Sequence, residues 1–259
     1  KIRDISSHVE DLNPHHLNFE TISKLQGADL STLPEISSSE RIGSCITKPG
    51  KFIAIGLNFS DHAAETGAEA PSEPIVFMKA TSCINGPNDD IEIVSGSKKL
   101  DWEVELGIII GKETKHISEN ESEKHILGYC LVNDISEREW QIEKMGQWVK
   151  GKSHDTYGPI GPYLVTKDEI SDINNLNMSL DVNGKKMQRG NTNTMIFNAN
   201  FIVSYLSKYM SLQPGDIITT GTPPGVGMGM KPQQFLKAGD TMKLSIENLG
   251  EQNSKVVAL

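Results

Sequence analysis

The chain has 259 residues, a formal net charge of −9 at pH 7, and 37% hydrophobic residues. This length is enough for one large domain with an appendage, or for two modest domains. The acidic balance argues against binding to nucleic acid or to an anionic membrane, because both require a basic surface. We therefore expect a small-molecule partner, with neither a nucleic acid nor a membrane as partner.

Three cysteines, Cys45, Cys83 and Cys130, are widely spaced among small or apolar residues. An odd number at such spacing does not indicate a disulfide framework, and it favours a reducing compartment. No apolar run approaches the roughly 18 residues that span a bilayer, and the first residues lack the apolar core of a signal peptide. The sequence therefore predicts a cytoplasmic protein.

The N-terminal residues 1–48 are polar and rich in Ser, His and Glu, and a turn signal at Pro49 and Gly50 follows them. We interpret them as a small N-terminal appendage and residues 49–259 as the main domain. The three His residues of the appendage lack the spacing of a metal site, so surface or capping roles are expected for them.

The apolar run 52–57 predicts a strand, and a short capped helix is expected behind it. On such a helix His62 and Glu65 lie at positions i and i+3, where the carboxylate can orient the imidazole as a general base. A solvated pair on a surface helix has the same pattern, so the spacing alone leaves both interpretations open. The following residues 66–74 are loop-like and can form a flap over a pocket.

Residues 101–106 predict a strand whose alternation places Glu103 and Glu105 on one face. The apolar run 107–111 carries this strand into the interior, where neighbouring like charges are costly unless a cation or a shared proton neutralises them. The same pattern also fits the wet face of a half-exposed strand. The two carboxylates by themselves do not decide between these interpretations.

A third carboxylate favours the buried interpretation. Asp134 ends the short apolar run 129–134, which predicts a buried strand that presents this side chain at a rim. Alone, an Asp at the end of a strand is usually only a turn residue. Together with Glu103 and Glu105 it predicts an all-oxygen site, which suits Mg²⁺, Mn²⁺ or Ca²⁺ and disfavours structural zinc.

Two further segments can contribute to a binding site. Lys150 and Lys152 are close in sequence, and one of them can face an acidic pocket and bind a substrate carboxylate or enolate, although an isolated Lys is usually solvated. The Gly-rich residues 220–229 follow a strand, so their backbone N–H groups can meet an anionic ligand. They lack the features of a P-loop or a dinucleotide fingerprint, and alone they are only a turn-rich loop.

The C-terminal half is rich in antiparallel β-structure. Residues 182–185 contain the Asn-Gly pair typical of a type I′ hairpin, and strands are predicted over 217–220 and 241–244. One helix is predicted over about residues 198–210, where apolar and aromatic side chains recur at helical spacing, and its aromatic side chains are expected in the core. The expected fold class is therefore α+β, predominantly β.

Together these segments resemble the fumarylacetoacetate hydrolase (FAH) family from about residue 50 to the C-terminus. The motifs that carry the resemblance are residues 55–59 with His62 and Glu65, 101–107, 133–136, 151–153 and 220–227. The leader, with residues 29–34, is similar to a bacterial subgroup of diketo-acid hydrolases, hydroxyheptadienedioate isomerases and ureidoglycolate lyases. One departure is Phe59, which stands where the family usually has Tyr, so the pocket wall is expected to lack a phenol.

The resemblance implies a mixed β-roll or β-sandwich with few helices, assembled as a homodimer, in which residues 49–259 form the catalytic domain. It implies the following roles: Glu103, Glu105 and Asp134 as ligands of Mg²⁺ or Mn²⁺, His62 with Glu65 as the base dyad, and Gln141, Lys152, Gly221 and Thr222 as substrate-binding residues. Lys152 is also expected to add a positive charge near the enolate that forms during the reaction.

The expected reaction is metal-dependent hydrolysis of a C–C bond in a 2,4-dioxo acid, of the acylpyruvate or diketo-deoxy sugar acid type, to a pyruvate-like acid and a carboxylic acid. The same site also fits isomerisation of a hydroxydienedioate, decarboxylation of oxaloacetate, or cleavage of ureidoglycolate. Hydrolysis is favoured because the dyad of His62 and Glu65 is complete. An alternative of another class is a non-catalytic domain that binds a metal-chelated organic acid.

Overall fold

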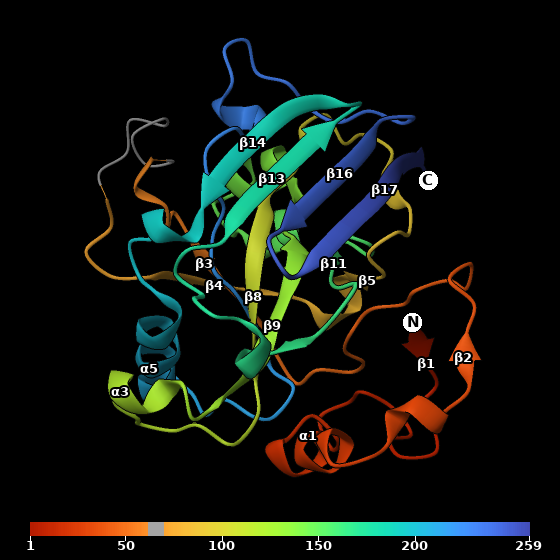
Figure 1. The fold of residues 1–259 in the computed structure, drawn as a ribbon. Helices are drawn as coiled ribbons and strands as arrows, with labels where there is room; N and C mark the ends of the chain where they lie inside the picture. Colours follow the sequence, from red (N-terminus) through yellow and green to blue (C-terminus); the bar gives the residue numbers. More distant parts are fainter. Residues whose placement is uncertain (62–69) are drawn as a thin grey trace.

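Strands made of nearly continuous apolar runs form the centre of the protein, which a computed structural model describes over residues 1–61 and 70–259. β8 (Val104–Ile110) and β9 (Ile126–Asn133) pair antiparallel, and every residue of both strands is buried. A strand that is covered on both faces needs apolar side chains at successive positions, which explains the runs. Both strands lie in the middle of the molecule (Figure 1).

These two strands belong to a mixed sheet of six strands. Its spatial order is β12 (Val165–Thr166), β9, β8, β15 (Ile217–Thr219), β3 (Phe52–Gly56) and β4 (Ile75–Lys79). β15 pairs antiparallel with β8 and parallel with β3. β4 forms an edge of the sheet, and its side chains Val76 and Met78 are exposed there.

A second sheet packs over the first. Its spatial order is β14 (Lys185–Asn191), β13 (Asn177–Val182), β16 (Thr241–Ile246), β17 (Gly250–Ala258) and β6 (Ile91–Ile93). Along β16 the buried residues Met242, Leu244 and Ile246 alternate with more exposed ones, as expected for a sheet with one face on the core. This sheet lies in front of β8 and β9 in the view of Figure 1.

The turn between β13 and β14 is the predicted type I′ hairpin. Asn183 has a φ of 51° and Gly184 a φ of 72°, and both angles lie in the left-handed region that this turn requires. Two packed sheets with few helices make the fold mixed α and β and predominantly β, so the expected fold class is confirmed.

The predicted helix is α5 (Ala199–Tyr209), and its core face differs from the expectation. Ile202, Val203 and Leu206 are buried, whereas Tyr209 is 65% exposed and the other aromatic side chains are half-buried. The aromatics recur every fourth residue from Phe197 to Tyr209, so their rings lie along one side of the helix. Successive rings stack as far as Tyr205, and the Tyr209 ring is tilted against that of Tyr205. The expectation that they form core was wrong, because the aliphatic face of the helix is the one that meets the core.

The N-cap of α5 offers a direct test of this helix. Asn198 accepts a hydrogen bond from the backbone N–H of Phe201 at 2.9 Å. We expect Asn198→Ala to lower the free energy of unfolding by about 1 kcal/mol, because one N–H group at the helix start loses its acceptor. Thermal or urea denaturation measures this loss, and Asn198→Asp, which keeps the acceptor, should restore most of it.

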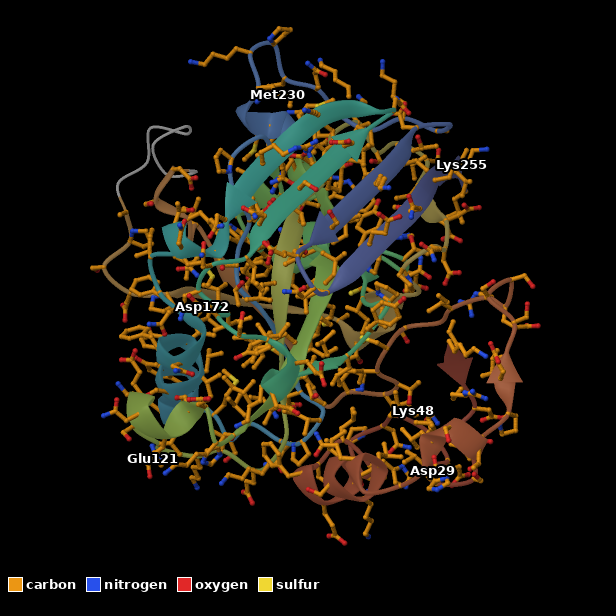
Figure 2. All side chains as sticks on the ribbon, viewed as in Figure 1. Asp29, Lys48, Glu121, Asp172, Met230 and Lys255 are labelled. Carbon is orange, nitrogen blue, oxygen red and sulfur yellow. The ribbon has the colours of Figure 1, made fainter. Side chains whose placement is uncertain are left out.

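The N-terminal segment lies to one side of the two sheets (Figure 1). In it β1 (Ile2–Arg3) pairs with β2 (Glu35–Ile36), and α1 (Phe19–Gln26) lies between them in sequence. Asp29 and Lys48 mark this segment in Figure 2, at the opposite end of the molecule from Met230. The segment is anchored by Leu17, which is fully buried in the main core.

Besides a number of 3₁₀ turns, several shorter elements accompany the two sheets. They are α3 (Glu119–Ser122), α4 (Val149–Lys152), a π-helical turn Glu139–Glu143, and the paired strands β7 (Leu100–Asp101) with β10 (Ser136–Glu137) and β5 (Ile84–Asn85) with β11 (Gly158–Pro159). Cys45, Cys83 and Cys130 are free and buried. None of the helices in the described part of the chain has the length and apolar character needed to cross a bilayer.

Candidate active site

Three buried carboxylates converge where β8 begins and β9 ends. Glu105 lies in β8, Glu103 directly precedes this strand, and Asp134 directly follows β9. The antiparallel register brings these residues together, and one oxygen atom from each lies within 4.8 Å of the other two. Glu103 is 6% exposed and Glu105 is 2% exposed, so the alternative of a wet strand face is wrong. We call these three residues the acidic cluster.

The strand that carries the cluster is interrupted, which the sequence pattern does not predict. β7 ends at Asp101 and β8 begins at Val104, so the expected continuous strand over 101–106 was wrong. The Asp101 carboxylate accepts hydrogen bonds from the N–H groups of Trp102 at 2.9 Å and Gly227 at 2.7 Å. The bond from Gly227 ties the chain to the Gly-rich loop, and Glu103 still lies close to Glu105.

Three buried cations surround the acidic cluster. The Nζ atom of Lys152 is 2.7 Å from Glu103 Oε2 and 2.7 Å from Asp134 Oδ2. The Nζ atom of Lys79 is 2.5 Å from Asp134 Oδ1. The guanidinium of Arg138 donates to Glu103 Oε1 at 2.7 Å and, from Nε, to Asp101 Oδ2 at 2.8 Å.

The two lysines of α4 point in different directions. Lys152 is buried against the acidic cluster, whereas Lys150 is exposed and donates to the backbone carbonyl of Lys144. The sequence leaves open which lysine faces the pocket. The sequence assigns no role to the other two cations of the site, Lys79 and Arg138. Lys79 only ends an apolar run, and Arg138 follows Asp134 by four residues in a segment with no regular pattern.

The charges of this region do not balance. The acidic cluster and the buried side chains linked around it by ion pairs comprise four carboxylates and three cations, namely Asp101, Glu103, Glu105, Asp134, Lys79, Arg138 and Lys152. They leave one formal negative charge in a region of low dielectric, where such an excess is costly. Within the described residues, Glu105 lacks a salt bridge and accepts hydrogen bonds from Thr219 and from the N–H of Gly221 at 2.8 Å.

The pKa shifts follow from this imbalance. Burial raises the pKa of Glu105 well above its usual value, and the nearby Asp134 and Glu103 raise it further. Burial also opposes ionisation of Glu103, but Lys152 and Arg138 outweigh it, so the pKa of Glu103 is lowered. Burial alone would lower the pKa of Lys152, yet Asp134 and Glu103 outweigh it and the pKa is raised.

A cavity of about 260 Å³ opens onto the acidic cluster. The polar residues of its floor are Glu103, Glu105, Arg138, Gln141, Lys152 and Thr222, beside Gly221. The apolar residues of its wall are Ile55, Leu57, Phe77, Ile142, Trp148 and Met228. A wider and more open groove of about 1150 Å³ borders the C-terminus, but no member of the acidic cluster lines it.

The structure brings most of the predicted site residues to this one cavity. Gln141, Lys152, Gly221 and Thr222 line it together with two members of the acidic cluster. His62 and Glu65 lie outside the described residues. Phe59 is fully buried in the core and is not among the described residues that line the cavity, and none of those lining residues is a Tyr.

The chain belongs to the fumarylacetoacetate hydrolase family, because the family model "Fumarylacetoacetate (FAA) hydrolase C-terminal" matches residues 51–257. A curated relative from Burkholderia cenocepacia, named "Putative hydrolase", is 56% identical over 97% of this chain and 90% of its own length.

Two solved structures show similar folds with different named activities. A fumarylacetoacetate hydrolase from Exiguobacterium antarcticum has a TM-score of 0.88 and 34% identity, over 99% of this chain and 92% of that one. A 2-hydroxyhepta-2,4-diene-1,7-dioate isomerase from Mycobacterium marinum has a TM-score of 0.71 and 35% identity, over 81% of this chain and 75% of that one. The recognised family is thus confirmed, and its members include hydrolases and isomerases.

Proposed function

We propose that this protein is a divalent-metal-dependent hydrolase that cleaves a C–C bond in a 2,4-dioxo acid, releasing a pyruvate-like acid and a carboxylic acid. The observation that carries the proposal is the convergence of Glu103, Glu105 and Asp134 beside Lys152 at the floor of a cavity. Membership of a family that contains hydrolases and isomerases supports the same class of reaction.

We propose Glu103, Glu105 and Asp134 as the ligands of Mg²⁺ or Mn²⁺. Carboxylate oxygens are the donors that these ions prefer, and the three side chains already offer one oxygen each within 4.8 Å. A divalent ion would also relieve the excess negative charge at Glu105. When bound, it would supply Lewis-acid polarisation of the 2-oxo group of the substrate.

The residues of the chain have distinct roles in this proposal. The Lys152 ammonium, held by Glu103 and Asp134, stabilises the negative charge that develops on the enolate when the C3–C4 bond breaks. Arg138 donates to Gln141 Oε1 at 3.0 Å, which leaves the Gln141 amide N–H groups for the substrate. Thr222 and Gly221 are proposed as substrate-binding residues because they border the same floor. The Gly221 N–H donates to Glu105 and the Thr222 hydroxyl donates to the Val104 carbonyl, so these bonds fix the shape of the floor beneath the acid.

The base in this proposal is His62, oriented by Glu65, which takes a proton from the water that attacks C4. Both residues lie outside the described part of the chain, so this assignment rests on the family resemblance. Hydrolysis is favoured over decarboxylation because decarboxylation needs no activated water. Isomerisation of a hydroxydienedioate is the second candidate, favoured by the similarity to the isomerase of Mycobacterium marinum. Two further alternatives are cleavage of ureidoglycolate and non-catalytic binding of an organic acid.

A pyruvate-release assay with acylpyruvates and diketo-deoxy sugar acids, in the presence of Mg²⁺ or Mn²⁺, tests the reaction. We expect His62→Ala to lower kcat by about 10²–10⁴-fold, because a positioned general base contributes about that factor. Mg²⁺ affinity, measured by calorimetry, should stay unchanged. Glu69→Gln, in the same segment but without an assigned role, is the control and should keep the wild-type rate.

Two outcomes would contradict these assignments. Turnover that survives His62→Ala would reject this residue as the base. Intact Mg²⁺ binding with no product from any of these acids would favour a binding domain, and conversion of a hydroxydienedioate without pyruvate release would favour the isomerase.

We further propose that residues 1–48 form an N-terminal domain and residues 49–259 the catalytic domain, which agrees with the extent of the family match. A homodimer in the cytoplasm is also proposed. The exposed Val76 and Met78 on the edge strand β4 support association, and three free buried cysteines suit a reducing compartment. Analytical ultracentrifugation tests the dimer, which a single species of 28.4 kDa would contradict.

A further inference from the structure

The cavity above the acidic cluster has two chemically different halves. Its charged lining residues are all buried and form the floor, whereas Phe77, Trp148, Ile142 and Met228 are half-buried or exposed and form the outer half. The two halves meet where the Lys152 Nζ atom lies 5.2 Å from the centre of the Phe77 ring. Phe77 and Trp148 meet edge to face, with ring centroids 5.1 Å apart. A side chain on Gly56 would place its Cβ 2.6 Å from the Trp148 ring, so the glycine lets the indole lie against this wall.

All the buried cations of the cavity are already engaged at its floor. Lys152 and Arg138 bridge carboxylates there, and Lys79 lies behind Asp134. Two exposed lysines near the cavity have other contacts: Lys144 lies over the ring of Trp140 and Lys150 donates to the Lys144 carbonyl.

The segments that contribute Ile55, Leu57 and Phe77 to the cavity belong to a stretch without basic residues of fixed charge. Residues 52–78 contain neither Lys nor Arg, and the one histidine of this stretch is His62, the proposed base. Among the described residues that line the cavity, the only Lys and Arg are Lys152 and Arg138. Among the described residues, a negative charge in the outer half would therefore meet apolar side chains and no Lys or Arg of its own, which is unfavourable.

The charge of the site leads to the same conclusion. Its four carboxylates and three cations have a net charge of −1, and a divalent ion changes this to +1. One substrate carboxylate then neutralises the site. A second carboxylate would restore a negative charge, and would do so next to the apolar wall.

From these observations we infer that the site selects monocarboxylic 2-oxo and 2,4-dioxo acids whose distal end is uncharged, and that it discriminates against dicarboxylic acids. This inference rests on the proposed function and narrows its substrate class. Alkyl acylpyruvates and diketo-deoxy sugar acids share the required chemistry, since neither has a second carboxylate. The isomerase of Mycobacterium marinum, by contrast, is named for a substrate with a carboxylate at each end.

A binding experiment with two matched ligands tests the selectivity. 2-Oxohexanoate and 2-oxoadipate have the same number of carbons and differ in the distal carboxylate, and neither has the 4-oxo group needed for cleavage. Calorimetry with the wild-type protein and saturating Mg²⁺ should give a Kd at least about 10-fold lower for 2-oxohexanoate, the scale of discrimination expected from an unpaired polar group. Equal affinity, or tighter binding of 2-oxoadipate, would overturn the inference.

A variant adds the missing cation. Ile142 is 47% exposed at the cavity mouth, so a Lys side chain fits there without burial of its charge. We expect Ile142→Lys to tighten 2-oxoadipate binding about 10-fold while leaving 2-oxohexanoate nearly unchanged. Ile142→Gln, polar but uncharged, is the matched control and should not favour 2-oxoadipate. An unchanged ratio of the two affinities in Ile142→Lys would overturn the inference.

The outcomes separate this inference from the proposed function. Failure of both ligands to bind in the presence of Mg²⁺ would reject the proposed site itself, whereas binding without discrimination would reject only the selectivity. Turnover then distinguishes the two substrate types whose distal end is uncharged, alkyl acylpyruvates and diketo-deoxy sugar acids. The type with the larger kcat/KM shows which distal end the apolar wall accepts. A dicarboxylic dioxo acid as the best substrate would overturn the inference.

Discussion

Replacing Glu105 with Gln is expected to stabilise the metal-free protein and to abolish its response to Mg²⁺. The pKa of Glu105 is raised in the folded state, chiefly by burial and then by Asp134 and Glu103. The folded protein therefore holds this proton more tightly than the unfolded chain, and stability is lost as the pH rises above the unfolded value of about 4.3. Gln is neutral and can accept the same hydrogen bonds from Thr219 and Gly221, so this cost disappears.

At neutral pH the expected result is a higher free energy of unfolding for Glu105→Gln, because ionisation of the buried carboxylate is costly and Gln carries no charge. This raises the melting temperature by roughly 2–4 °C for each kcal/mol in a protein of this size. The advantage of the variant should grow as the pH rises from about 4 toward neutral. Mg²⁺ should raise the melting temperature of the wild type but not of Glu105→Gln, and pyruvate release should fall to background.

Glu103→Gln is the matched comparison, because it changes the same residue type in the same cluster with the opposite expected effect on stability. Glu103 is paired with Lys152 and Arg138, and its pKa is lowered. The ionised Glu103 carboxylate stabilises the folded state at pH values above the pKa of Glu in the unfolded chain. Glu103→Gln removes this stabilisation, so the metal-free variant should have a lower melting temperature than the wild type. If both variants destabilise the metal-free protein equally, the proposed charge imbalance at Glu105 is wrong.

Lys152→Met is expected to cause the largest combined loss of stability and activity. Its ammonium lies between Glu103 and Asp134, and removal of one partner from a buried ion pair typically costs about 3–5 kcal/mol. The enolate also loses its nearest positive charge from the protein, so kcat should fall by about 10²–10³-fold. Urea denaturation and the pyruvate-release assay measure the two losses.

Lys150→Met provides the control on the same short helix. Lys150 is exposed and contacts only the Lys144 carbonyl among its described hydrogen-bond partners, so its loss should change stability by less than about 0.5 kcal/mol. Turnover should stay at the wild-type level. Equal losses in the two variants would mean that the helix as a whole, rather than the ammonium of Lys152, accounts for the effect.

The local features of the fold follow from short stretches of sequence. The Asn-Gly pair at Asn183 and Gly184 predicts the hairpin, and Asn198 with the apolar spacing behind it predicts α5. The acidic cluster is also visible in the sequence, because Glu103 and Glu105 precede an apolar run and Asp134 ends another. Such features depend on neighbouring residues, whose preferences are the same in any fold.

Other features depend on which distant segments meet. The aromatic side chains of α5 are not in the core, because the helix turns its aliphatic face inward. The strand before β8 is interrupted, because Asp101 bonds the loop at Gly227. Neither result follows from the pattern of the segment itself. The interruption depends on Gly227, which is more than a hundred residues away from Asp101 in sequence, and the orientation of α5 depends on the core that the helix covers.

The sequence by itself determined that the protein has buried β-strands, an acidic cluster suited to a hard divalent ion, and the motifs of its family. Only the tertiary structure decided that Lys152 and not Lys150 faces the acidic cluster, and that Lys79 and Arg138 complete its charges. The physical reason is that these ion pairs join residues 18 to 55 positions apart, so their geometry follows from strand register and not from local periodicity.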